Sequence, residues 1–173
     1  MIVFTPKFGL RHPLAASKLS DFCGKSKFQR LIPDDGAGLP KGLAADDKVR
    51  RVLFCSGKIW IHLMDHRVKV SAKEPQKLND VVFVRLEQVS PFPYDLVQEQ
   101  LKKYRNAEFV WVQEEPKNMG AWTYVSPRFT TAAKGITNKL PRLISRKSAA
   151  APATGYPQID KKEQTEIVES CFV

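Results

Sequence analysis

The sequence has no long apolar run that could cross a membrane. Its longest candidate, Ile59–Met64, is interrupted by His62 and falls far short of the roughly 20 residues that a spanning helix needs. The N-terminus, Met-Ile-Val-Phe-Thr-Pro-Lys, lacks the features of a secretory signal and is not an Arg- and Ser-rich amphipathic transit peptide. We therefore expect no membrane contact, and the sequence encodes no address of its own.

Cysteine is also scarce. The three cysteines, Cys23, Cys55 and Cys171, are far apart and odd in number, so neither a disulfide framework nor a zinc site is predicted. Cys55 ends an apolar run and is expected to be a small buried hydrophobic residue. This usage favours a reducing compartment.

No dense block of positive charge accompanies the net charge of +10. Such an excess favours anionic partners: nucleic acid, phosphorylated ligands or an acidic protein face. However, the Lys and Arg residues are spread from Lys7 to Lys162, without a run of five or six cations and without interleaved aromatic residues. We therefore predict no nucleic-acid partner and a scattered, solvated basic surface.

Several motifs of catalysis and phosphate binding are incomplete. The glycines of 36–42 do not form a Gly-x-Gly-x-x-Gly loop, because Lys41 holds the third position and no strand precedes them. His62 and His66 are four residues apart, but the position after His62 is Leu63, where a zinc hydrolase would place its glutamate base. The sequence therefore predicts no catalytic, cofactor-binding or metal-binding residue in this chain.

From about residue 50 the chain alternates short apolar runs with amphipathic segments. The predicted strands are 52–55, 81–84, 109–112 and, more weakly, 140–145; the predicted helices are 58–70, one beginning after 90–93, one within 120–129, and 160–171. This alternation indicates an α/β fold, with a mostly parallel sheet flanked by helices and joined by right-handed crossovers. At 173 residues the chain is long enough for one such domain with a sizeable core.

Three local details accompany these elements. Ser90 is expected to cap the second helix. The stretch Glu114–Asn118 is expected to be a polar turn, and Pro127 to limit or kink the third helix.

The chain divides into two parts by composition. Residues 1–48 lack sustained periodicity and are expected to form an irregular N-terminal arm and linker, whereas residues 49–173 form the α/β domain. In such a sheet, ligands and interfaces gather where the carboxyl ends of the strands meet loops. Four loops are expected at that edge: 56–58, 88–93, 113–120 and 146–154.

Six sequence segments, in order along almost the whole chain, are similar to one enzyme family. They are Thr5–Lys7 with Leu10–Pro13, Phe28–Pro33, Phe54–Lys58, Arg85–Gln88 with Ser90–Pro93, Gln113–Pro116 with Asn118 and Gly120, and Ser148–Gly155. Together they resemble the C-terminal domain of the thiamine-dependent decarboxylating component of 2-oxoglutarate dehydrogenase. The resemblance implies a transketolase-like C-terminal domain.

The resemblance also implies what the parent enzyme would do. The family is homodimeric, decarboxylates 2-oxoglutarate on thiamine diphosphate with magnesium in the tricarboxylic acid cycle, and passes the succinyl group to a lipoyl acyltransferase. Its upstream domains hold the cofactor through a Gly-Asp-Gly motif, which is absent here. We therefore expect this chain alone to hold no cofactor and to be inactive. Its expected partners are the upstream thiamine-binding domains, a homodimer partner and the acyltransferase.

Several alternatives remain open at the level of sequence. The parent substrate could instead be the related 2-oxoadipate, and the chain could be a stand-alone, non-catalytic module that binds a protein or a nucleotide. The family implies the mitochondrial matrix in a eukaryote and the cytoplasm in a bacterium.

Two sets of site residues follow from the resemblance. Some bacterial members bind acetyl-CoA or AMP near the boundary of this domain, and phosphate contacts here are predicted at Lys7, Arg11, Arg146, Lys147 and Ser148. The alternative is that these cations face water or an acidic neighbouring domain.

The second set is an interface. Trp111 lies within a predicted strand and is expected in the core, whereas residues beyond that strand are candidates to contact another domain. The predicted interface residues are Glu115, Asn118, Met119 and Trp122.

Overall fold

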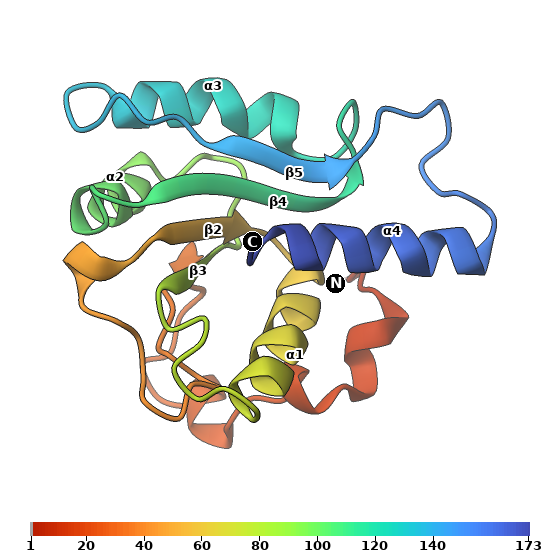
Figure 1. The fold of residues 1–173 in the computed structure, drawn as a ribbon, viewed down its shortest axis with the longest axis horizontal. Coiled ribbons are helices and arrows are strands. Elements are labelled where there is room, and N and C mark those ends of the chain that lie inside the picture. Colours follow the sequence, from red (N-terminus) through yellow and green to blue (C-terminus); the bar gives the residue numbers. More distant parts are fainter. Residues whose placement is uncertain (1) are drawn as a thin grey trace.

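The computed structural model describes residues 2–173 and shows one sheet with helices on both faces (Figure 1). The strands lie in the order β1-β3-β2-β4-β5, and only β1 is antiparallel to its neighbour. The strands are β1 (Leu31–Ile32), β2 (Arg51–Cys55), β3 (Val81–Leu86), β4 (Glu108–Pro116) and β5 (Arg142–Arg146); the helices are α1 (Ile59–Ser71), α2 (Tyr94–Lys103), α3 (Trp122–Ala133) and α4 (Pro157–Ser170). The predicted α/β fold with a mostly parallel sheet is confirmed.

Strand β2 lies at the centre of the sheet and is buried along its whole length. Because successive side chains point to opposite faces, Val52 and Phe54 belong to one core cluster and Leu53 and Cys55 to the other. The first cluster packs under α2 and α3, and the second under α1 and α4. The continuous apolar runs of the sequence are therefore explained by helices that cover both faces.

Aromatic rings fill the cluster under α2 and α3. Phe129 of α3 meets Phe54 edge-on, with ring centroids 4.9 Å apart, and meets Phe92 in the same manner at 5.4 Å. Trp111 of β4 is buried beside them, as the sequence predicted. Such edge-to-face pairs add to the free energy of burying apolar area.

Two local expectations were wrong, and of the two outcomes expected at Pro127 only the kink stays a prediction. Ser90 caps no helix: α2 begins at Tyr94, after Pro93. Glu114–Pro116 is not a turn, because β4 continues past an irregularity to pair Pro116 with Arg146; the turn begins only at Lys117. Pro127 does not end α3, which runs on to Ala133.

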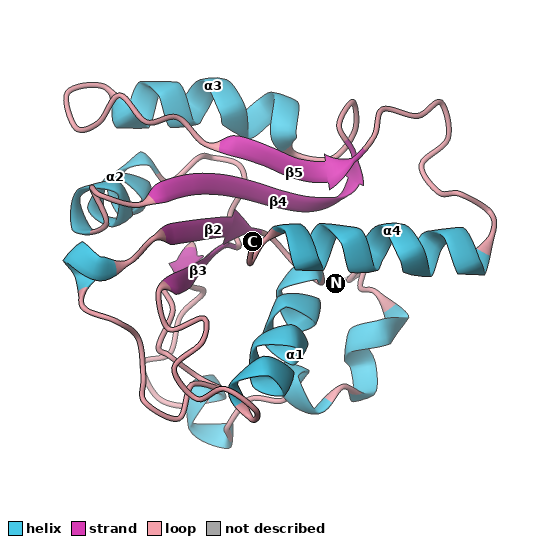
Figure 2. Ribbon diagram, in the orientation of Figure 1, coloured by secondary structure: helices cyan, strands magenta, loops and turns pink. Residues whose placement is uncertain are grey.

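The N-terminal arm forms short 3₁₀ turns and loops beside α1 (Figure 2). It includes one element that the sequence did not predict, the two-residue strand β1. A buried ion pair also ties the arm to the domain: Arg67 Nη2 of α1 donates to Asp34 Oδ2 at 2.6 Å. The same oxygen accepts the amide of Phe83 at 2.8 Å, and the Arg67 guanidinium lies 3.6 Å from the Phe83 ring centroid.

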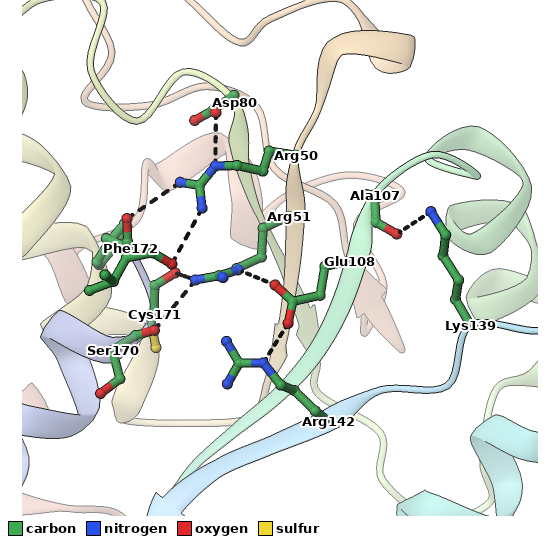
Figure 3. A network of polar contacts seen from close by, with 11 residues as sticks. Arg50, Arg51, Asp80, Ala107, Glu108, Lys139, Arg142, Ser170, Cys171 and Phe172 are labelled. Carbon is green, nitrogen blue, oxygen red and sulfur yellow. Dashed lines mark hydrogen bonds and ion pairs between the residues drawn. The ribbon is translucent and has the colours of Figure 1, made fainter.

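At the amino-terminal edge of the parallel strands, arginine side chains bind the last residues of the chain (Figure 3). Arg51 Nη1 donates to the carbonyl of Cys171 at 2.8 Å, and Arg51 Nε donates to Glu108 Oε2 at 2.6 Å. The other Glu108 oxygen accepts from Arg142 Nε, and Arg50 Nη2 reaches the carbonyl of Phe172 at 3.3 Å. Cations beside the last carbonyls of α4 complement its dipole and satisfy acceptors that the helix leaves free.

Candidate functional site

The carboxyl ends of β2, β4 and β5 open onto a recess of about 370 Å³. Strand β2 leads into α1 on one face of the sheet, whereas the adjacent β4 leads into α3 on the other. Such a change of side leaves a crevice at the strand ends, where ligands of α/β proteins commonly bind. The lining residues are Phe8, Lys58, His62, Glu114, Glu115, Arg146, Pro152, Ala153, Asp160 and Gln164.

A lysine–glutamate pair occupies the floor of the recess. Lys58, just before α1, places its Nζ 2.8 Å from Glu114 Oε1 at the end of β4. His62 Nε2 lies 3.9 Å from the same oxygen, which is too long for a hydrogen bond. Phe8 of the arm stacks on His62, with ring centroids 4.7 Å apart. The arm thereby covers one side of the recess.

Burial lowers the pKa of His62, and the nearby Lys58 also lowers it, while Glu114 opposes the shift. The imidazole is therefore neutral at pH 7. Across residues 2–173 no three His, Cys, Asp or Glu side chains are grouped so that they could hold a metal ion.

Arg146, a predicted phosphate contact, lies in the wall of the recess and already forms ion pairs with two carboxylates. Its side chain is 10% exposed, its Nη2 lies 2.6 Å from Asp160 Oδ1, and its Nε lies 3.5 Å from Glu163 Oε2. Lys147 and Ser148 follow it and are exposed.

The two other predicted phosphate contacts lie on the arm. Lys7 and Arg11 are exposed at the ends of the 3₁₀ turn Lys7–Arg11, whose Phe8 alone lines the recess. Of the five predicted phosphate contacts, only Arg146 therefore lines the recess; Lys147 and Ser148 follow it in the chain, and Lys7 and Arg11 lie on the arm.

The predicted interface residues surround the turn between β4 and α3. Asn118 bonds the backbone of Ala149 in both directions: its Nδ2 donates to the carbonyl at 2.9 Å, and its Oδ1 accepts the amide at 3.1 Å. Glu115 is exposed, whereas Met119 and Trp122 are half-buried, with Trp122 packed on the core. Asn118 thus positions the loop after β5, and an interface at the four residues remains a prediction.

Gln113 organises this turn and was not singled out from the sequence. Its Oε1 accepts from Trp111 Nε1 and from the amide of Trp122, both at 3.0 Å. Its Nε2 donates to the carbonyl of Met119 at 2.7 Å. A glycine follows at 120 because a Cβ there would approach Gln113 Nε2 to 3.0 Å, in a backbone conformation with φ of +68°. The available signal was an amide directly after the apolar run 109–112.

The geometry thus offers a mixed-charge recess with loops held in place around it. A family profile described as 2-oxoglutarate dehydrogenase C-terminal matches residues 16–172. The chain belongs to this family.

Relatives match along the whole length of the chain. It is 44% identical to 2-oxoglutarate dehydrogenase, mitochondrial, of Caenorhabditis elegans over 171 residues, which is 99% of this chain and 16% of that protein. It is 44% identical to 2-oxoglutarate dehydrogenase-like, mitochondrial, of Rattus norvegicus over 172 residues, with the same coverage of both proteins. It is 41% identical to 2-oxoglutarate dehydrogenase E1 component of an Exiguobacterium strain over 174 residues, 99% of this chain and 17% of that protein.

The chain spans about one sixth of the length of the curated relatives that it matches.

Within residues 2–173, no helix has the length and apolar character to cross a membrane.

Proposed function

We propose that this chain is the C-terminal domain of a 2-oxoglutarate dehydrogenase, with a role in packing and dimerisation and in the response to an effector. The observation that carries the proposal is the match of 99% of this chain to 16% of the C. elegans relative. The fold supports it, because the sheet and its helices form a complete core with two clusters of buried apolar side chains.

The cofactor of the parent enzyme would be held by its other domains. Thiamine diphosphate needs metal and diphosphate ligands, and the sequence lacks the Gly-Asp-Gly motif implied by the family. Of the three carboxylates that line the recess, Glu114 is paired with Lys58 and Asp160 with Arg146, which leaves one, Glu115. In the proposed enzyme, thiamine-binding domains, a second subunit and a lipoyl acyltransferase are the partners. The compartment is the mitochondrial matrix in a eukaryote or the cytoplasm in a bacterium.

The arm supplies a surface for that packing. Its large apolar side chains are widely exposed, among them Phe4 at 96% and Phe22 at 72%. Large exposed apolar patches mark interaction sites, and the arm carries many exposed apolar side chains along its sequence. We propose that the arm, residues 1–48, lies between the α/β domain, residues 49–173, and the upstream domains.

A response to an effector would be centred on the end of β5. Arg146 lines the recess, Lys147 and Ser148 follow it directly in the chain, and Asn118 fixes the loop that comes next. Lys7 and Arg11 would contribute only if the arm moved toward Arg146, because neither of them lines the recess.

The proposal can be tested with a chimera in which this chain replaces the matching segment of the C. elegans enzyme. We expect the chimera to decarboxylate 2-oxoglutarate with added thiamine diphosphate and magnesium, and to sediment as a dimer. The C. elegans enzyme truncated before that segment is the control, and we expect it to be inactive. A folded but inactive chimera, or turnover by this chain alone, would contradict the proposal.

A further inference from the structure

The two edges of the sheet differ in length. The edge strand β1 has two residues, Leu31–Ile32, and presents little backbone to another chain. The opposite edge strand β5 has five residues, and no described strand pairs with its outer side. An unpaired edge of this length is a template on which another strand can be added.

A groove of about 690 Å³ follows β5 along its whole length. One wall is the strand itself, from Arg142 to Lys147, and the other is a single face of α4. The α4 residues recur at helical spacing, as Ile159, Lys162, Glu163, Glu166, Ile167 and Ser170. Ile159 is 47% exposed, so the groove offers apolar area as well as a strand edge.

The side chains of β5 that face α4 form a simple pattern. Arg142, Ile144 and Arg146 alternate along the strand, and Ile144 belongs to the core cluster under α1 and α4. Along this face of β5, an apolar side chain therefore lies between two cationic ones. Arg142 uses its Nε for Glu108, while Arg146 uses its guanidinium for Asp160 and Glu163, so Arg142 keeps the more available donors.

We propose that β5 is a docking edge for an extended segment of another polypeptide with the pattern acidic, apolar, acidic on alternate residues. Such a segment would continue the sheet as a sixth strand. Its carboxylates would lie beside Arg142 and Arg146, and its central apolar side chain would contact Ile159. Opposite charges on neighbouring strands stabilise their pairing, whereas like charges do not.

Charge disfavours a second copy of this chain as the occupant. In an antiparallel pair of β5 strands centred on Ile144, Arg142 of one copy would lie opposite Arg146 of the other. Each chain also carries a net charge of +10, so the two copies repel. On the α4 wall, the exposed Lys162 lies 3.9 Å from Glu166, and Glu163 also lines the groove.

The test uses a fluorescent five-residue peptide, acetyl-Glu-Thr-Ile-Thr-Glu-amide, and the full 173-residue chain. We expect saturable binding by anisotropy and slower amide hydrogen exchange at residues 142–146. The peptide with Lys in place of both Glu residues should bind about ten-fold more weakly, because two cross-strand pairs reverse sign. A peptide methylated on its backbone amides should not bind, since strand addition needs those donors.

Two charge-reversal variants locate the binding. Lys162→Glu, on the groove wall, should weaken binding of the Glu peptide, whereas Lys134→Glu, at the end of α3 on the other face, should leave it unchanged. Equal binding of the Glu and Lys peptides, unchanged exchange at β5, or no binding would overturn the proposal. Slow exchange at β5 that depends on protein concentration without peptide would identify a second copy as the occupant and would also overturn it.

Discussion

The arm and the α/β domain both carry aromatic side chains, but only the domain buries them. Phe54 and Phe129 are fully buried between the sheet and its helices, whereas Phe22 is 72% exposed. An exposed side chain forfeits the roughly 1.5–3 kcal/mol that full burial contributes. The comparison indicates that the domain folds around its own core, whereas a surface outside this chain that covers the arm is part of our proposal.

The two regions are joined by the pairing of β1 with β3 and by a buried ion pair. Asp34 of the arm pairs with Arg67 of α1, and both side chains are at least 96% buried. These contacts hold residues 31–34 of the arm to the domain, whereas most residues before them are exposed.

The largest difference is expected from one phenylalanine in each region. Phe129→Ala should lower the free energy of unfolding by about 4 kcal/mol, because it leaves a cavity among packed rings. The matched change Phe22→Ala should alter it by less than about 0.5 kcal/mol. Urea denaturation of the isolated chain measures both. Similar losses from the two changes would remove the distinction between the regions.

Breaking the ion pair between Asp34 and Arg67 should have the next largest effect on stability. Asp34→Ala leaves the Arg67 charge buried without its partner and should cost about 3 kcal/mol. The control is Glu74→Ala, which removes an exposed pair with Lys77 and should cost about 0.3 kcal/mol. If both changes were equally mild in thermal unfolding, the arm would not depend on this contact.

Within the domain, the turn after β4 should depend on Gln113. Gln113→Leu leaves the indole of Trp111 and the amide of Trp122 without an acceptor, and should cost about 2 kcal/mol. Gln158→Leu, at an exposed site in α4, should be close to neutral. Hydrogen exchange can be followed at residues 117–122, and rates unchanged by Gln113→Leu would show that the amide does not hold the turn.

The smallest effect concerns pH at the C-terminal anchor. Although burial acts to raise the pKa of Glu108, hydrogen bonds from Arg142 and Arg51 lower it overall. A lowered pKa in the folded state contributes stability above the usual value of 4.5, and this contribution is lost as the pH falls through the folded value.

We therefore expect the urea midpoint to fall between about pH 5 and about pH 3, and to fall less in Glu108→Gln. The same decline in both proteins would show that this carboxylate makes no contribution to the acid sensitivity. Glu74→Gln, at an exposed site, is the matched control.

The sequence predicted the regular domain well because its signals are local. Continuous apolar runs located β2, β3 and β4, and the weaker run at 140–145 located β5 within two residues. Periodicity ended α4 within one residue of its observed end at Ser170.

The remainder depends on contacts between distant residues. Strand β1 is only two residues long and exists because it pairs with β3. The extension of β4 to Pro116 depends on its pairing with Arg146, 30 positions away, and the role of Asp34 depends on Arg67, 33 positions away. In the recess, the sequence placed the right loops together but could not show that Arg146 is already paired.

The most direct test of the arm as an interface uses its one exposed thiol. Cys55 and Cys171 are buried, and burial raises the pKa of both, that of Cys171 to about 12, so Cys23 alone should react quickly with iodoacetamide in the isolated chain. In the chimera with the C. elegans enzyme, we predict that labelling of Cys23, measured by peptide mass spectrometry, slows by about ten-fold or more because the arm is covered. Equal labelling rates in the isolated chain and in an active chimera would contradict the account.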